Sequence, residues 1–240
     1  MAGHNKWSKI KRDKGVNDAK RGAVFTKIGN QIAIAARSGT DPTMNSALAM
    51  AMEKAKAANM PNANIQRAID RVNDKNAAVL EEVTYEGMGP AGIGIIIEAA
   101  TDNKNRTFPE VRNALTKNGG RIADAGSVMF QFDRKGVIRV AASGEEALLT
   151  ILDAGAEDAN EEDGEIIVYT DPKELAKVRE TLVEARVRVT EAELQYVAKN
   201  TIEVGESEQA EKILKLLDAI DELDDVVNVH TNVDITADIQ

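Results

Sequence analysis

The spacing of the apolar residues changes near residue 80, and this change limits the folds open to the chain. Before it, apolar residues recur every three or four positions, which is the period of an amphipathic helix. After it, many apolar segments are short and rich in Ile and Val, which is typical of strands. We therefore expect a helical N-terminal domain followed by α+β structure.

Three helices are predicted before residue 80, over residues 17–37, 42–58 and 62–73. Gly39 ends the first, Asp41-Pro42 supplies the cap and first position of the second, and Pro61 separates the second from the third. Their apolar faces are expected to carry Val24, Phe25, Ile28, Ile32, Ala35, Met44, Leu48, Met52, Ala55, Ile65, Ile69 and Val72. Such stripes favour a three-helix bundle, preceded by a basic arm (residues 1–16) without apolar periodicity.

The order of the later elements predicts two α+β domains of the ferredoxin-like type. Residues 135–198 are predicted to form, in order, a strand, a helix, a hairpin turning at Asp163-Gly164, a helix and a strand. The flanking residues are predicted to form a hairpin over "EEVTYEG" and "IGIIIEAAT", helix 104–118, strand 127–133, strand "TIEV", helix 207–222 and strand "VVNVHTNV".

The fold class expected is therefore multidomain α and α+β, with an N-terminal three-helix bundle followed by two ferredoxin-like domains. Residues 1–80 form the arm and helical domain, and residues 81–134 with 199–240 form a discontinuous middle domain. Residues 135–198 are an insertion within that middle domain. A linear order of three domains is the alternative.

Charge divides the chain at the same place. Residues 1–80 contain 14 Lys/Arg and 6 Asp/Glu, a net charge of +8, whereas residues 81–240 contain 16 and 34, a net charge of −18. The formal net charge of −10 hides this asymmetry, which is typical of a cationic module that faces a polyanion. Cations that merely solvate helix faces are the alternative.

The first 27 residues contain eight Lys/Arg and two Asp. We assign nucleic-acid contact to His4, Lys6, Trp7, Lys9, Lys11, Arg12, Lys14, Lys20, Arg21 and Lys27. Each phosphate that is neutralised releases counterions, so the affinity should fall steeply with salt. Trp7 is the only tryptophan, and it either stacks on a base or pins the arm to the helical bundle. Nothing in these residues distinguishes DNA from RNA.

A polar loop at residues 101–112 is a second candidate site. Asn103, Asn105 and Arg106 lie between a predicted strand and a predicted helix, in an otherwise acidic domain. They could bind a phosphate or a peptide group. A helix cap formed by the loop's own side chains is an equally good interpretation.

Other motifs do not indicate catalysis. "GMGPAG" (87–92) matches G-x-G-x-x-G, but a strand follows it where a dinucleotide site needs a helix, so we expect a hairpin turn. "DANEEDGE" (158–165) has glycine one position too late for a calcium loop and is interpreted as an acidic hairpin tip. There is no cysteine. Neither of the two histidines, His4 and His230, has a second His nearby in the sequence with which to bind a metal ion.

We therefore expect no enzyme, metal or cofactor, with a metal-dependent nuclease using the acidic hairpin as the minor alternative. No apolar run approaches the ~20 residues of a membrane span, and the N-terminus lacks the apolar region of a secretory signal. The expected location is cytoplasmic, and the expected partner is nucleic acid. No membrane or small-molecule substrate is indicated, and the acidic α+β domains are expected to face protein.

Long motifs along nearly the whole chain carry a family resemblance. They include "MAGHNKW", "DAKRGAVFTKI", "MPNANIQRAI", "YEGMGPAGIGIIIEAATDNKNRT", "GSVMFQF", "KGVI" and "AGAED". The chain resembles the YebC/PmpR family, which is related to the mitochondrial translational activator of cytochrome c oxidase. Asn5 stands where serine is common in the family. The resemblance implies an all-α domain, two ferredoxin-like domains, a cytoplasmic location and no enzymatic activity.

The resemblance implies two functions. One is a probable DNA-binding transcriptional regulator. The other is a translation factor that binds ribosomal RNA and relieves stalling at proline-rich segments, with Gly3 to Lys27 reaching toward the peptidyl-transferase region. Residues 17–73 contain no recognisable helix-turn-helix motif, which slightly weakens the case for reading duplex DNA.

Overall fold

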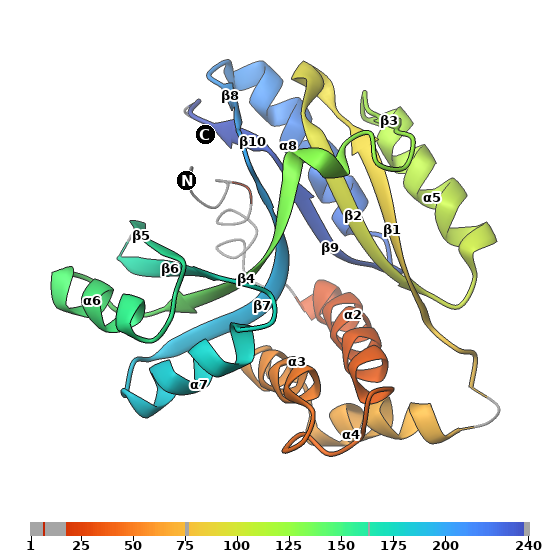
Figure 1. Cartoon of the computed structure of the whole chain (residues 1–240). Coiled ribbons are helices and arrows are strands. Elements are labelled where there is room, and N and C mark those ends of the chain that lie inside the picture. The colour runs from red at the N-terminus through yellow and green to blue at the C-terminus, as the bar shows by residue number, and fades with distance from the viewer. Residues whose placement is uncertain (1–6, 8–17, 75–76, 163, 238–240) are drawn as a thin grey trace. The chain divides into compact units, whose positions relative to one another are not determined.

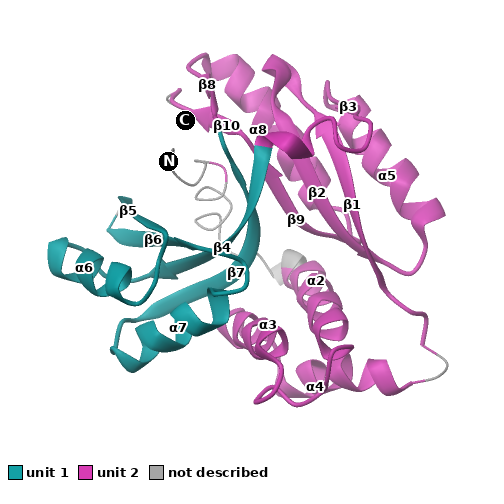
Figure 2. Cartoon of the chain, viewed as in Figure 1, with its two compact units in different colours: residues 1, 132–199 teal, residues 2–131, 200–240 magenta. Residues whose placement is uncertain are grey.

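A computed structural model describes residues 7, 18–74, 77–162 and 164–237 of the chain (Figure 1). The chain forms two compact units, residues 132–199 and residues 2–131 with 200–240, which are teal and magenta in Figure 2. The first unit begins three residues before the insertion expected from the sequence and ends one residue after it. The helices before residue 80 belong to the same unit as the middle sheet, and their separation as a domain stays a prediction.

The helical part contains α2 (Asp18–Ala36), α3 (Ser46–Ala57) and α4 (Asn62–Asp70), followed by a short 3-10 turn, η1 (Arg71–Asn73). The three helices share one apolar core. It is formed by Ile28, Ile32, Ala36, Leu48, Ala55, Met60, Ile65 and Ile69. Most of these residues lie on the stripes that the helical period predicts, so that part of the prediction is confirmed.

Helix α3 begins four residues later than predicted. Its N-cap is Asn45, whose side chain accepts a hydrogen bond from the Leu48 backbone N–H at 3.1 Å. Asp41 instead accepts from the backbone N–H of Thr43, at 2.9 Å, and closes a turn before the helix. Met44 therefore precedes the helix and is 87% exposed, so its predicted inward position is wrong. Val72, in η1, is also exposed and does not join the core.

The middle sheet has the strand order β3-β1-β2-β9, and every pairing in it is antiparallel. The strands are β1 (Glu81–Met88), β2 (Gly94–Thr101), β3 (Arg121–Ile122) and β9 (Val226–Thr231). The same part of the chain contains the 3-10 turn η2 (Pro90–Gly92) and the helices α5 (Lys104–Lys117) and α8 (Ser207–Asp221). Ile95 and Ile97 of β2 pack with Val111 of α5 and Leu216 of α8 in one core. The predicted hairpin is confirmed by the pairing of Met88 with Gly94, which places the last four residues of "GMGPAG" (89–92) in the turn.

The segment "VVNVHTNV" forms two strands where the sequence predicts one. Asn232 interrupts it, because its side chain accepts from the Gly94 N–H at 2.7 Å and donates to Gln131 Oε1 at 2.8 Å. The second piece, β10 (Val233–Ile235), pairs in parallel with β8 (Ile202–Val204). These two short strands form a sheet of their own.

The prediction of a strand over 127–133 is wrong. Residues 129–131 form a 3-10 turn, η3 (Met129–Gln131), and the strand β4 (Phe132–Val140) begins only at Phe132. The cause is Glu86, whose carboxylate accepts from the backbone N–H groups of Gly126, Val128 and Met129 at 2.5, 2.7 and 2.8 Å. Backbone donors that bond a side chain are not available to a sheet ladder.

The inserted unit contains β4, α6 (Glu145–Asp153), β5 (Asp158–Glu162), β6 (Glu165–Thr170), α7 (Leu175–Glu184) and β7 (Val189–Ala198). Its antiparallel sheet has the order β5-β6-β4-β7. The predicted acidic hairpin is confirmed by the pairing of Glu162 with Glu165. Gly164 supplies the positive φ of +83° at this turn, and Asp163 lies outside the described residues.

Candidate nucleic-acid interface

Most of the candidate arm residues lie outside the described part of the chain. These are His4, Lys6, Lys9, Lys11, Arg12 and Lys14. Lys20 lies in α2, and its side chain is also outside the description. Trp7, Arg21 and Lys27 are the candidates whose side chains the structure places.

The Trp7 indole is buried and only 3% exposed. It belongs to the apolar core that α8 shares with the middle sheet. Its Nε1–H donates to Asp218 Oδ1 of α8 at 3.0 Å. Of the two alternatives for this residue, packing on the protein is the one that the structure shows. The prediction that the helical bundle receives it is wrong, because the acceptor lies on α8.

Lys27 also contacts α8. Its ammonium group donates to the Asp221 carbonyl oxygen and lies 3.7 Å from the Asp221 carboxylate. Asp221 is the last residue of α8, where unpaired carbonyl groups and the helix dipole favour a cation. The Lys27 side chain is only 13% exposed. It thus has an ion-pair partner within the chain, and its contact with phosphate stays a prediction.

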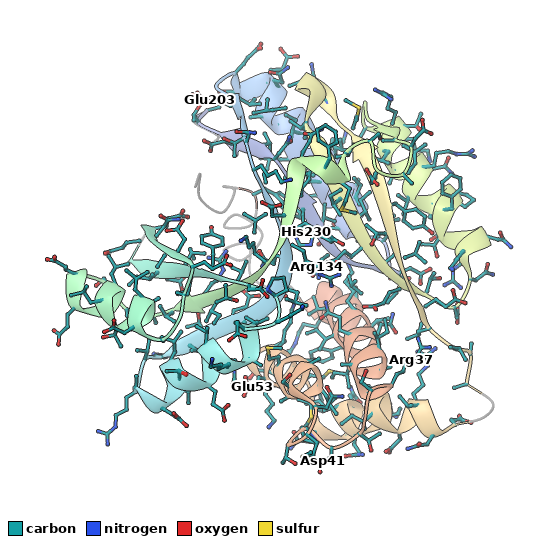
Figure 3. The ribbon with its side chains drawn as sticks, in the orientation of Figure 1. Arg37, Asp41, Glu53, Arg134, Glu203 and His230 are labelled. Carbon is teal, nitrogen blue, oxygen red and sulfur yellow. The ribbon has the colours of Figure 1, made fainter. Side chains whose placement is uncertain are left out.

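Several cations of the helical part are engaged with the chain itself. Arg37, at the C-terminal end of α2 (Figure 3), donates to the Leu80 carbonyl at 2.8 Å. Arg71 donates to the Ala78 carbonyl at 3.4 Å. Both side chains therefore hold the segment that leads into β1. Each helix also has an exposed cationic residue, namely Arg21 on α2, Lys56 on α3 and Arg67 on α4.

The predicted polar site at residues 101–112 is a capped helix start. Asn103 is the N-cap of α5, and its side chain accepts from the Arg106 N–H at 3.2 Å. The Arg106 guanidinium donates to Asp225 at 2.7 and 2.9 Å and to Asp102 at 3.2 Å. Asn105 is exposed. The side chains of this loop therefore cap helix α5, which is the second of the two interpretations.

Asp225 supplies the anion at this helix start. Its carboxylate also accepts from the hydroxyl groups of Thr107 at 2.6 Å and Thr101 at 3.0 Å. Burial alone would raise the pKa of Asp225, but the bonds from Thr107, Arg106 and Thr101 outweigh it and hold the pKa below its ordinary value. Sequence reasoning missed Asp225, because it lies more than 100 residues away from its partners along the chain.

Within the described residues, no group of three or more His, Cys, Asp or Glu side chains gathers to hold a metal ion. Glu161 of the acidic hairpin accepts from the Gly144 N–H at 3.0 Å. His230, labelled in Figure 3, lies 3.0 Å from Glu98 on the neighbouring strand. Among the helices that are described, none is both long enough and apolar enough to cross a membrane.

Comparison with known families matches nearly the whole chain. The family model described as "TACO1/YebC protein N-terminal domain" matches residues 5–75. The family model described as "TACO1/YebC second and third domain" matches residues 80–233. Residues 76–79 lie between the two matches, and Arg71 bonds to Ala78 within them.

Curated relatives and a solved structure agree with this match. A "probable transcriptional regulatory protein" of Roseiflexus castenholzii is 46% identical over 249 residues, covering 100% of this chain and 97% of the relative. One of Caldanaerobacter subterraneus is 46% identical, covering 98% and 99%. A conserved hypothetical protein of Aquifex aeolicus is 40% identical with a TM-score of 0.86, covering 92% of this chain and 93% of that one.

Proposed function

This chain belongs to the TACO1/YebC family, and from that premise we propose that it regulates transcription by binding DNA through its basic N-terminal residues. The names of its relatives support a regulatory role. The observation that carries the DNA-binding step is the charge distribution. Eight Lys/Arg stand in the first 27 residues of a chain whose residues 81–240 have a net charge of −18.

The same distribution supports an orientation for the complex. A polyanion is attracted to the N-terminal cations and repelled by the acidic α+β part, so binding should begin at the arm. The exposed side chains of Arg21, Lys56 and Arg67 extend the set of cations into the helical part. Phosphate contacts of this kind do not depend on base sequence, and they lose affinity as salt rises.

We further propose that both α+β parts have the ferredoxin-like topology. The inserted unit has the element order β-α-β-β-α-β and the sheet order β5-β6-β4-β7, as the split βαβ motif requires. The order β3-β1-β2-β9 is equivalent if β1 stands for the third strand of that motif, moved ahead of the first. In this proposal the acidic domains contact other proteins and have no catalytic role. The protein acts in the cytoplasm.

Crosslinking in cells, followed by sequencing of the attached nucleic acid, tests the proposed function. We expect genomic DNA to be recovered, and we expect this recovery to be lost when Lys9, Lys11 and Arg12 are replaced by Gln. A matched control replaces the exposed Lys173, Lys177 and Lys212 of the acidic part, which removes the same charge. Recovery of ribosomal RNA instead of DNA would contradict the transcriptional role and favour a translation factor.

A further inference from the structure

We propose that the contact of Trp7 with helix α8 is a latch, which the binding of nucleic acid releases. This inference rests on the proposed function. It adds a regulated step, in which the arm exchanges an intramolecular partner for the polyanion.

The protein surrounds the indole ring with apolar side chains and also provides an acceptor for its N–H. Trp7 is 3% exposed in an apolar core that includes Leu216 and Leu217 of α8. Its N–H donates at 3.0 Å to Asp218, and a bond to a charged acceptor is stronger than one between neutral groups. One helical turn further on, Asp221 receives Lys27. Two residues of the predicted interface thus contact the same end of one helix.

The latched arrangement opposes the binding of a polyanion. The groups that hold Trp7 and Lys27 are both acidic, namely Asp218 and Asp221. A phosphate that contacts Lys27 must therefore displace the Asp221 carboxylate, which lies 3.7 Å from the ammonium group. A buried indole also offers no face for a base to stack on.

The latch therefore lowers the apparent affinity for nucleic acid. When the binding-competent state is only a fraction of the population, the apparent Kd is the intrinsic Kd divided by that fraction. A change that weakens the latch without altering the arm's charge should raise the affinity. Trp7→Phe is such a change, because phenylalanine keeps an aromatic ring but lacks the N–H that Asp218 accepts.

The sole tryptophan makes the latch directly observable. We would titrate the full chain with a short DNA duplex and, separately, with single-stranded RNA, and follow binding by the anisotropy of the labelled nucleic acid. In parallel samples with unlabelled nucleic acid, the emission of Trp7 should lose its blue-shifted, buried character over the same concentration range. The loss shows as a red shift or as quenching by a stacked base. If nucleic acid binds but the emission stays blue-shifted and protected from acrylamide, the latch is contradicted and the proposed binding function is not.

Variants give the second readout. Trp7→Phe should bind about 3- to 10-fold more tightly than the wild type, which is the effect of losing one hydrogen bond from the closed state. Asp218→Asn should act in the same direction and exceed its control Glu211→Gln, an equal charge change at an exposed position of α8. Weaker binding by Trp7→Phe, with Asp218→Asn no different from Glu211→Gln, would overturn the proposal. Circular dichroism verifies that each variant is folded. If neither the wild type nor any variant binds either probe, both the proposed function and the latch are contradicted.

Discussion

At the residue scale, Glu86 is a buried carboxylate that determines the path of a loop. Three backbone N–H groups of residues 126–129 point at its oxygens. Burial alone would raise the pKa of Glu86, but these backbone bonds outweigh it and hold the pKa below its ordinary value. The charged carboxylate therefore stabilises the folded state. It accepts the backbone hydrogen bonds that these N–H groups would donate to a neighbouring strand if the segment were part of a sheet.

Replacing Glu86 by Gln should lower the free energy of unfolding by about 1–3 kcal/mol at neutral pH, because the buried network loses its charge and one of its two acceptor oxygens. The unfolded carboxyl titrates near a pKa of ~4.3, and the folded pKa is lower. The stabilisation is thus complete above ~pH 5 and is lost as the pH falls through the folded value. Urea titrations at several pH values measure this difference. Glu82→Gln, at an exposed position of β1, is the control, and an equal effect there would contradict the account.

Asp225→Asn should destabilise the start of α5 in the same pH-dependent way. Its folded pKa is also depressed, so the loss relative to wild type should be largest at neutral pH and should shrink toward pH ~3. The amide keeps one neutral acceptor oxygen, which is a weaker partner for the hydroxyl groups of Thr101 and Thr107. Thermal melts compare it with Asp224→Asn at the exposed neighbouring position. A Tm change that is the same for both variants would show that only net charge matters.

At the element scale, the sequence predicts those elements whose signals are local. Helix α2 was expected over 17–37 and spans Asp18–Ala36, because its apolar period is regular and Gly39 follows it. The hairpin of β1 and β2 has its glycine-rich turn between two strand patterns. Where the prediction failed, a distant side chain decides. Glu86 prevents a strand at 127–131, and Asn232 divides the last strand by bonding to Gly94 and Gln131.

The inserted sheet depends on a close approach at Gly136. A Cβ at this position would lie 2.2 Å from Thr170 Oγ1 and 2.8 Å from Leu175 Cβ. Gly136→Ala should therefore force β4 away from β6 or α7, and we expect a loss of about 1–3 kcal/mol as for other overpacked cores. Gly22→Ala is the matched control, because nothing lies within 4 Å of its Cβ. Since Gly22 is exposed within α2, that change should stabilise by ~0.5–1 kcal/mol. Chemical denaturation measures both, and a neutral Gly136→Ala would contradict the packing.

At the scale of the whole molecule, the inserted unit should be dispensable for nucleic-acid binding. It contains 9 Lys/Arg and 16 Asp/Glu over residues 132–199. Its ends are paired, since Phe132 lies opposite Ala198, so a short Gly/Ser linker can replace it without stretching the chain. We expect the shortened protein to bind DNA within about threefold of the full chain, because the proposal assigns the phosphate contacts that dominate affinity to the arm. Loss of binding beyond tenfold, in a protein that still melts cooperatively, would assign the contact to the insertion.

The candidate site could be predicted only in part. Composition and charge are enough to identify the basic N-terminus, since both are counted directly from the sequence. The partner of Trp7 could not be predicted, because Asp218 lies 211 residues away and an isolated tryptophan in a basic run fits either a base or a protein core. The same holds for Lys27, whose partner Asp221 is 194 residues distant. Long-range pairings of single side chains leave no periodic signal in the sequence.

The central claim is that the basic N-terminal residues bind nucleic acid through its phosphates, and the salt dependence of binding tests it most directly. The logarithm of the association constant for a DNA duplex should fall linearly with the logarithm of the salt concentration. Replacing Lys9, Lys11 and Arg12 by Gln should reduce that slope by about 2 to 3, since each lost phosphate contact removes ~0.9. The control triple at Lys173, Lys177 and Lys212 should leave the slope unchanged. Equal slopes for the wild type and the arm variant would contradict the account.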